Sequence, residues 1–225
     1  MSSIPRDVLD FLSDLKKNNH RDWMQDHKKR YQSNEKELKK FYAEIVNGLN
    51  KNDKIEKTKV FRINRDIRFS KDKTPYNTHR SVSFSRAGAH RRGGYYLRIQ
   101  PGNSLMGGGF FSPEPKDLLR IRKEFEIDAG EMRAILNNTD FKNAFSGLNQ
   151  EHQVKTAPKG FVKDHPNIDL IKNKAFFVTH SFSDEEVLAS DFKDNLLHHY
   201  ELLRPFFNYM SEILTTDLNG VSLLK

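Results

Sequence analysis

The stretch Gly94-Tyr-Tyr-Leu-Arg-Ile-Gln100 alternates apolar and polar side chains, which is the period of a β-strand with one buried face. The turn Pro101-Gly-Asn103 follows it, and Ser104–Phe111 is predicted to return as a second strand, forming a β-hairpin. Upstream, Arg80–Ser85 and Val60–Phe69 show the same alternation. These strands follow one another without intervening helices, which favours an antiparallel or mixed sheet.

Apolar residues at helical spacing dominate both ends of the chain. The first fifty residues are predicted to be helical, with a break at Asn18-Asn19 and then one long helix, or two joined near Ser33. Further helices are predicted at Glu114–Ile127, Ala129–Asn138 and Asp140–Leu148, and from Ser190 to about Leu214 with a kink or restart at Pro205. The sequence therefore predicts one α+β domain over residues 1–225. Its mainly antiparallel or mixed sheet runs from about residue 60 to 111, has a further strand near 175–181, and is packed by N-terminal and C-terminal helices.

Composition narrows the class of protein. The chain has no cysteine, so disulfides, thiolate metal ligands and thiol nucleophiles are excluded. No apolar stretch approaches the roughly 20 residues that span a membrane, and no apolar signal core follows Met1. The aromatic content of 11% is typical of a chain that folds around a core. We therefore expect a cytoplasmic protein with no membrane partner.

The net charge of +8 is distributed unevenly. Residues 51–100 carry 14 Lys and Arg against 4 Asp and Glu, while the rest of the chain carries slightly more acidic than basic residues. A local excess of this kind indicates an anionic partner, such as a phosphorylated ligand or a nucleic acid. The functional site is therefore expected in this quarter of the sequence.

The basic quarter contains Phe61-Arg-Ile-Asn-Arg-Asp-Ile-Arg-Phe69, followed by Ser70-Lys-Asp-Lys-Thr-Pro-Tyr76. An earlier segment reads Asn18-Asn-His-Arg-Asp-Trp23. Together these motifs resemble a widespread family classified as a domain of unknown function, DUF2461. The resemblance continues through Gly107–Gly109 and Thr156–Phe161, so it covers nearly the whole chain. It implies a shared fold and supplies no activity.

If residues 62–68 form a strand, its alternate side chains project from one polar face, about 7 Å apart along the chain. Neighbouring strands would add Tyr96 and Arg98 to that face. The opposite face, with Phe61, Ile63, Phe84, Leu97 and Ile99, is predicted to be buried against helices that include Trp23, Leu203 and Phe207. Guanidinium groups bind phosphate or carboxylate at two points, and lysines from the following loop could close over such an anion. The predicted ligand-binding residues are Arg62, Asp66, Arg68, Lys71, Asp72, Lys73 and Tyr76.

Three functions are consistent with this pattern. The first hypothesis is recognition of an anionic, phosphorylated small molecule at the Arg/Lys-rich face and loop. The second is a nucleic-acid-binding module that uses the same face, with Tyr96 as a stacking platform. The third is a structural or interaction protein in which Asp66 and Asp72 pair internally with the cations. Arg65, which shares the apolar parity, is expected to be structural in each case.

Other motifs point to packing. Trp23, His27 and Tyr31 have helical spacing and are predicted to form an aromatic edge facing the core, with a hydrogen-bonded His. The histidines lack the spacing of metal ligands, so we expect no metal site. Gly107–Gly109 matches neither glycine-rich phosphate motif and is expected to mark close backbone packing. The cofactor and any catalytic residue stay unassigned.

Overall fold

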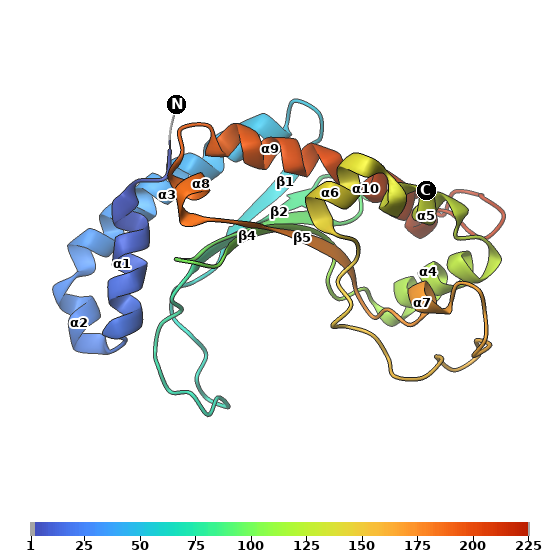
Figure 1. Cartoon of the computed structure of the whole chain (residues 1–225), viewed down its shortest axis with the longest axis horizontal. Coiled ribbons are helices and arrows are strands. Elements are labelled where there is room, and N and C mark those ends of the chain that lie inside the picture. The colour runs from blue at the N-terminus through green and yellow to red at the C-terminus, as the bar shows by residue number, and fades with distance from the viewer. Residues whose placement is uncertain (1–2, 225) are drawn as a thin grey trace. The chain divides into compact units, whose positions relative to one another are not determined.

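The computed structural model describes residues 3–224 and has an α+β fold with an open, antiparallel five-stranded sheet (Figure 1). The strands are β1 (Ile55–Val60), β2 (Arg80–Arg86), β3 (Gly94–Ile99), β4 (Ser104–Phe110) and β5 (Phe176–Phe182). They are hydrogen-bonded in the order of the chain. The predicted fold class is therefore confirmed, together with the hairpin that joins β3 to β4.

Helices precede, interrupt and follow the strands. Before β1 lie α1 (Arg6–Lys17), α2 (Arg21–Asp26) and α3 (Lys28–Leu49). Between β4 and β5 lie α4 (Pro115–Ile127), α5 (Gly130–Asn137), α6 (Thr139–Phe145) and α7 (Ile168–Ile171). After β5 come α8 (Asp184–Leu188), α9 (Phe192–Leu202) and α10 (Arg204–Thr215). The predicted restart at Pro205 is confirmed, because α10 takes this proline into its first turn, where no backbone N–H is needed. The long N-terminal helix is interrupted at His27, not near Ser33.

The chain forms two compact units. The first comprises the chain up to Phe84 together with Tyr96–Met106 and Ser181–His198. The second comprises Ser85–Tyr95, Gly107–His180 and the chain from His199 onward. Each of the strands β2 to β5 contributes residues to both units. Whether the whole chain behaves as one domain stays a prediction.

The first unit has a core built from helices and one face of the strands. Helices α1 and α3 lie side by side, and the ring of Phe41 in α3 stacks on Phe192 with centroids 5.7 Å apart (Figure 1). Phe84, Leu97 and Ile99 are fully buried and Ile63 nearly so, as predicted. The predicted burial of Phe61 is wrong, because this side chain is 37% exposed.

The second unit has an aromatic core. Tyr95 makes edge-to-face contacts with Tyr200 and Phe207, with centroid distances of 4.9 and 5.0 Å. The glycine run allows β4 to lie close to its neighbours: a Cβ on Gly108 would collide with the side chain of Leu203, and a Cβ on Gly109 would meet the Phe177 backbone at 2.5 Å. Close packing therefore explains these glycines, as expected from the sequence.

The strand predicted over Arg62–Arg68 is wrong. The strand β1 lies earlier, at residues 55–60, although the polar stretch Asn50–Lys59 predicts a loop. Residues 61–79 are irregular, with an isolated antiparallel bridge between Asn64 and Tyr76. The segment does not extend the sheet, because its backbone closes on itself as a distorted hairpin and side chains of the loop satisfy further carbonyl groups. The predicted irregular loop from Ser70 to about Thr78 is confirmed. No helix within residues 3–224 combines the length and apolar character needed to cross a membrane.

Candidate functional site: an exposed basic loop

Residues 61–79, called the basic loop below, connect β1 to β2 and extend away from the strands (Figure 1). Backbone pairing closes the base of the loop. The amide of Phe61 donates to the carbonyl of Ser81 at 2.9 Å, and the amide of Asn77 donates to the carbonyl of Ile63 at 2.7 Å. One step further along, the amide of Arg65 donates to the carbonyl of Pro75 at 2.9 Å. The loop is thus a distorted hairpin whose tip lies around residues 66–73.

Arg65 braces the interior of the loop. Its Nη1 donates to Asp72 Oδ2 at 2.5 Å, to the carbonyl of Thr74 at 3.1 Å and to the Thr74 hydroxyl. Asp72 in turn accepts a hydrogen bond from the Thr74 amide at 2.9 Å. Backbone and side-chain hydrogen bonds from Thr74, followed by that from Arg65, lower the pKa of Asp72. The structural interpretation of Arg65 is therefore confirmed, and Asp72 belongs to the same brace.

Asn19 joins the two motifs of the sequence. Its side-chain Nδ2 donates to the carbonyl of Tyr76 at 2.9 Å, and its Oδ1 accepts from the amide of Tyr76 at 3.1 Å. The two residues are 57 positions apart. This two-point amide contact fixes one strand of the loop to the segment between α1 and α2. The two motifs therefore contain residues that hold the basic loop in place, and these residues have a structural role.

The remaining charged side chains of the basic loop face solvent. Arg68 and Asp66 form a two-point ion pair, with Nε–Oδ1 at 3.0 Å and Nη2–Oδ2 at 2.7 Å, and their side chains are 77% and 61% exposed. This pairing with Arg68 lowers the pKa of Asp66. Lys73 donates to the carbonyl of Ile67 at 3.0 Å. Within residues 3–224, the side chains of Arg62 and Lys71 make no hydrogen bond or ion pair, and Lys73 has no carboxylate partner.

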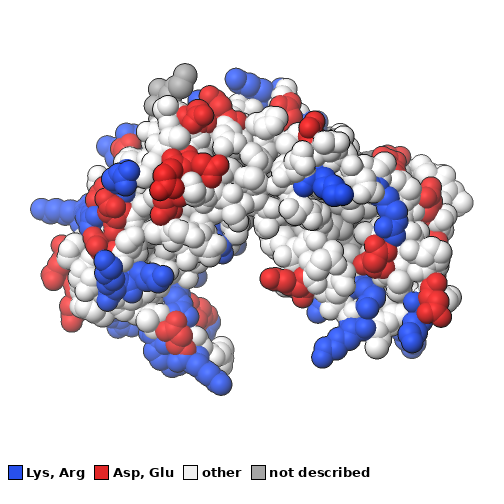
Figure 2. Space-filling view, viewed as in Figure 1, with Lys and Arg blue, Asp and Glu red and all other residues white. Residues whose placement is uncertain are grey.

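The predicted site residues therefore separate into two groups. In the first group, Asp66 forms an ion pair with Arg68, and Asp72 forms one with Arg65. The half-buried Tyr76 is held by a hydrogen bond from its backbone amide. Arg62, Lys71 and Lys73 form no ion pair with a described residue, although the charge of Arg62 helps to lower the pKa of Asp66. Figure 2 shows Lys and Arg gathered where the basic loop projects. At the tip lies Phe69, whose side chain is 97% exposed.

An aromatic and cationic cluster lies at the base of the loop. The ring of Phe61 contacts Tyr96 edge to face at 6.2 Å, and Lys59 Nζ lies 5.0 Å from the centre of the Phe61 ring. On β3, Arg98 donates from Nη2 to the Asn103 carbonyl at 3.2 Å, while its buried Nε has no partner in the described chain. The sequence placed Tyr96 and Arg98 on the polar face correctly. It missed Phe61, because the presumed strand register assigned that residue to the core.

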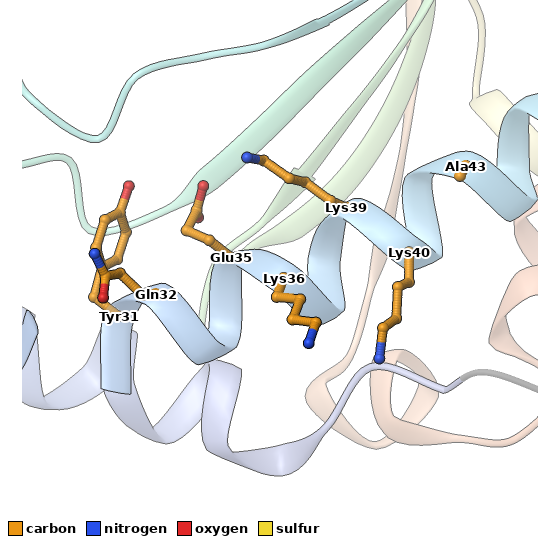
Figure 3. Close-up of a pocket in the computed structure, with 7 residues that line it drawn as sticks. All are labelled: Tyr31, Gln32, Glu35, Lys36, Lys39, Lys40 and Ala43. Atoms are coloured by element: carbon orange, nitrogen blue, oxygen red, sulfur yellow. The ribbon is translucent and has the colours of Figure 1, made fainter. Parts of the chain in front are cut away.

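A surface pocket along α3 was not predicted from the sequence. An open cavity of about 660 Å³ is lined by Tyr31, Gln32, Glu35, Lys36, Lys39, Lys40 and Ala43. In Figure 3, Tyr31, Glu35 and Lys39 point to one side of the helix. Glu35 is committed to Arg80, and Lys40 pairs with Glu37 at 2.8 Å. Lys36 and Lys39 form no ion pair with any residue from 3 to 224, so the pocket adds positive charge without a converging set of polar groups.

The aromatic edge predicted in the first helices is partly altered by the helix break. Trp23 lies in α2 and Tyr31 in α3, and their rings lie 5.6 and 5.9 Å from the ring of Phe11. His27 stacks on Trp23 at 4.0 Å, and its Nδ1 is 2.8 Å from the Trp23 carbonyl. The prediction of a hydrogen-bonded His is confirmed. All three rings are half-buried, so this edge is part of the packing of the first unit.

The fold and this site define an α+β protein with an antiparallel sheet and a basic loop that is braced by its own side chains. The chain belongs to the family described as "Conserved hypothetical protein (DUF2461)", whose model matches residues 7–209. The match includes both motifs discussed above, so the resemblance seen in the sequence is confirmed. No curated protein and no solved structure shows significant similarity to the chain.

Proposed function

We propose that this protein binds a phosphate-bearing anion through the basic loop, and that the ligand is the extended backbone of a single-stranded nucleic acid. One observation carries the proposal: the loop is held in shape by Arg65, Asp72 and Asn19, while Arg62, Lys71 and Lys73 are exposed and form no ion pair with a described residue. Arg62 and Lys71 make no side-chain hydrogen bond in the described chain and are available to a ligand, and Lys73 contacts only the Ile67 carbonyl.

The exposure of the loop favours an extended ligand over a small one. Sites for small molecules are concave and bury most of the ligand surface, so their charged groups are largely removed from water. Arg68 is instead 77% exposed, and Arg62, Lys71 and Lys73 are exposed as well. A nucleic-acid backbone does not require enclosure, because counterion release supplies the binding energy at an open surface. The phosphorylated small molecule, ranked first from the sequence, is the second candidate.

Aromatic rings near the cations support the choice of a single strand. Sites for single-stranded nucleic acids combine cations along the backbone with rings on which bases stack. Phe69 at the tip is 97% exposed, and Phe61 and Tyr96 lie in contact at the base of the loop. Double-stranded DNA keeps its bases stacked on one another, so an exposed Phe gains less from it.

The test is fluorescence anisotropy of a labelled single-stranded oligonucleotide, titrated with protein at several salt concentrations. Each phosphate contact with a single strand adds about 0.7 to the slope of log K against log salt. The triple variant Arg62→Gln, Lys71→Gln and Lys73→Gln is expected to lower the affinity and to reduce the slope by about 2. Phe69→Ala is expected to lower the affinity and leave the slope unchanged, because stacking releases no counterions.

A matched control separates the site from general electrostatics. Lys155, Lys159 and Lys163 are exposed in the second unit, and replacing all three by Gln removes the same charge. Equal losses in both triple variants, or no binding by the parent protein at 50 mM salt, would show that the proposal is wrong. A thermal-shift screen of nucleotides and sugar phosphates tests the second candidate, since a ligand at 100 times its Kd adds about 2.7 kcal/mol. Such a shift without oligonucleotide binding would favour the small molecule.

A further inference from the structure

A second group of cations lies in the other compact unit. It lines a cavity of about 450 Å³ between the segment that follows β2 and the helix α10. Arg86 is the last residue of β2, His90 and Arg91 come from the segment that follows it, and Arg204, Ser211 and Glu212 come from α10. The volume is within the range of pockets that take small molecules, roughly 300–1,000 Å³. None of these residues belongs to the basic loop.

The wall of the cavity is fixed by contacts within the same unit. The Ser211 hydroxyl accepts a hydrogen bond from the Arg92 amide at 2.9 Å, and Arg86 Nη1 donates to the Arg92 carbonyl at 2.9 Å. The guanidinium of Arg86 also lies over the ring of Phe207, 4.9 Å from its centre. Arg86 itself is 5% exposed. The segment between β2 and β3 is thus held in place before a ligand binds. Binding therefore costs less conformational entropy, because this segment is already ordered.

Glycine lets the connection between β2 and β3 approach the core at this point. Gly93 has φ of +85°, a left-handed conformation that side-chain-bearing residues rarely adopt. A Cβ at this position would also lie 2.7 Å from Cε1 of Phe207. The close approach keeps Arg92 next to Ser211 and so positions the preceding residues, His90 and Arg91, at the cavity.

Arg204 has a charged side chain without a partner. Its Nε is buried, and within residues 3–224 the guanidinium makes no hydrogen bond or ion pair. A buried guanidinium nitrogen without an acceptor is unfavourable, because the hydration it loses is not replaced. An oxyanion in the cavity would supply the acceptor.

The lining of the cavity favours an anionic ligand. Three guanidinium groups and one imidazole line the cavity, against the single carboxylate of Glu212. Glu212 is exposed and forms no ion pair with another described residue. Nη1 of Arg91 lies 2.8 Å from Nε2 of His90, so these two side chains form one group. A phosphate monoester carries up to two charges and three terminal oxygens, which several guanidinium groups can share.

We infer that this cavity binds the phosphate group of a small phosphorylated molecule. Arg204 and Arg91 contact the phosphate oxygens, His90 supports Arg91, and the remaining volume accommodates the group that carries the phosphate. Arg86 holds the wall of the cavity through Arg92. This inference does not depend on the nucleic-acid proposal, because the two sites use different residues in different units.

The test is isothermal titration calorimetry with inorganic phosphate and with glycerol 3-phosphate, at constant ionic strength. We expect saturable binding to the parent protein and a loss of about tenfold or more in Arg204→Gln and in Arg91→Gln. Glu212→Gln is expected to bind phosphate more tightly than the parent, because it removes the one negative charge that repels the ligand. Arg6→Gln, at an exposed position of the first unit outside both proposed sites, is the matched control and is expected to bind phosphate like the parent.

Each outcome has a defined meaning. Absence of saturable phosphate binding by the parent, or unchanged binding in a folded Arg204→Gln protein, would overturn the inference. If Arg204→Gln fails to fold, Glu212→Gln decides, and equal or weaker phosphate binding in that variant contradicts the site. Succinate serves as a dicarboxylate probe, and tighter binding of succinate than of phosphate would refute the phosphate assignment. Oligonucleotide binding by Arg204→Gln should be unchanged, so the failure of one proposal is distinguishable from the failure of the other.

Discussion

The guanidinium of Arg80 and the carboxylate of Glu35 form a two-point ion pair in the first unit. Arg80 Nε lies 2.5 Å from Glu35 Oε1 and Nη2 lies 2.9 Å from Oε2, and the side chains are 5% and 17% exposed. Burial opposes the charge of Arg80, but the hydrogen bond and charge of Glu35 outweigh it, so the pKa of Arg80 is raised. The pair connects α3 to the first residue of β2. Its residues lie 45 positions apart, and no local pattern in the sequence indicates it.

Removing one partner of this pair is predicted to be strongly destabilising. Glu35→Gln leaves the buried charge of Arg80 without a counterion, which is expected to cost about 3–5 kcal/mol of unfolding free energy. The control is Glu37→Gln, which removes an exposed pair with Lys40 and is expected to cost less than about 1 kcal/mol. Urea denaturation measures both. Similar small changes in the two variants would contradict the structural role assigned to Glu35.

His79 is predicted to make the stability of the protein depend on pH. Burial, followed by the charges of Arg98 and Arg80, lowers the pKa of this half-buried imidazole below its ordinary value of 6.5. Between the lowered pKa and 6.5 the unfolded chain binds more protons at this position than the folded protein does. The contribution of neutral His79 is therefore complete above pH 6.5 and is lost as the pH falls through that window.

The measurement is a series of urea midpoints between pH 8 and pH 5 for the parent protein and for His79→Gln. The midpoint of the parent is expected to fall more steeply on acidification than that of the variant. The comparison with the variant removes the effect of the other histidines. Parallel curves would show that His79 titrates alike in the folded and unfolded states.

At the scale of elements, sequence patterns predicted those strands that have one buried face. In β2 and β3, Phe84, Leu97 and Ile99 face the core and alternate with half-exposed residues, so the period of two is preserved. The basic loop has the same alternation without the same burial, since Ile63 is buried while Phe69 is 97% exposed. The contacts that replace the strand come from Asn19, 57 residues away, and from side chains within the loop. A pattern within ten residues does not contain that information.

The Asn19 contact is predicted to control how firmly the basic loop is held. Asn19→Ala removes two hydrogen bonds to the Tyr76 backbone and is expected to cost about 1–3 kcal/mol. Because the base of the loop then opens more often, trypsin should cleave faster after the basic residues between 62 and 73. Limited proteolysis followed by mass spectrometry locates the cuts.

Asn18→Ala is the matched control for this experiment. The side-chain Nδ2 of Asn18 donates to the carbonyl of Asp14, near the end of α1, at 3.0 Å. This variant should weaken α1 and leave the cleavage rate within the basic loop unchanged. Equal rates of cleavage in the Asn19→Ala and parent proteins would mean that the loop is held by Arg65 and its partners alone.

At the scale of the whole molecule, the uneven distribution of charge underlies both proposed sites. The excess of basic residues between positions 51 and 100 predicted an anion site, and it supplies both proposed sites. Arg62, Lys71 and Lys73 belong to the first unit, whereas Arg86, His90 and Arg91 belong to the second. The cavity of the second unit was not predictable, because Ser211 contacts Arg92 from 119 positions away. Nothing in the neighbourhood of either residue in the sequence indicates that pairing.

The edge strand β1 has a consequence for the behaviour of many molecules together. It ends the order of the sheet, and its residues Glu56, Lys57, Thr58 and Lys59 are all exposed. An uncovered sheet edge is a template on which an extended chain of another molecule can add and start an aggregate. Charged side chains oppose this, because pairing along such an edge would remove them from water. The polar side chains of β1 led the sequence to predict a loop there. The same side chains oppose self-association of the protein in a crowded solution.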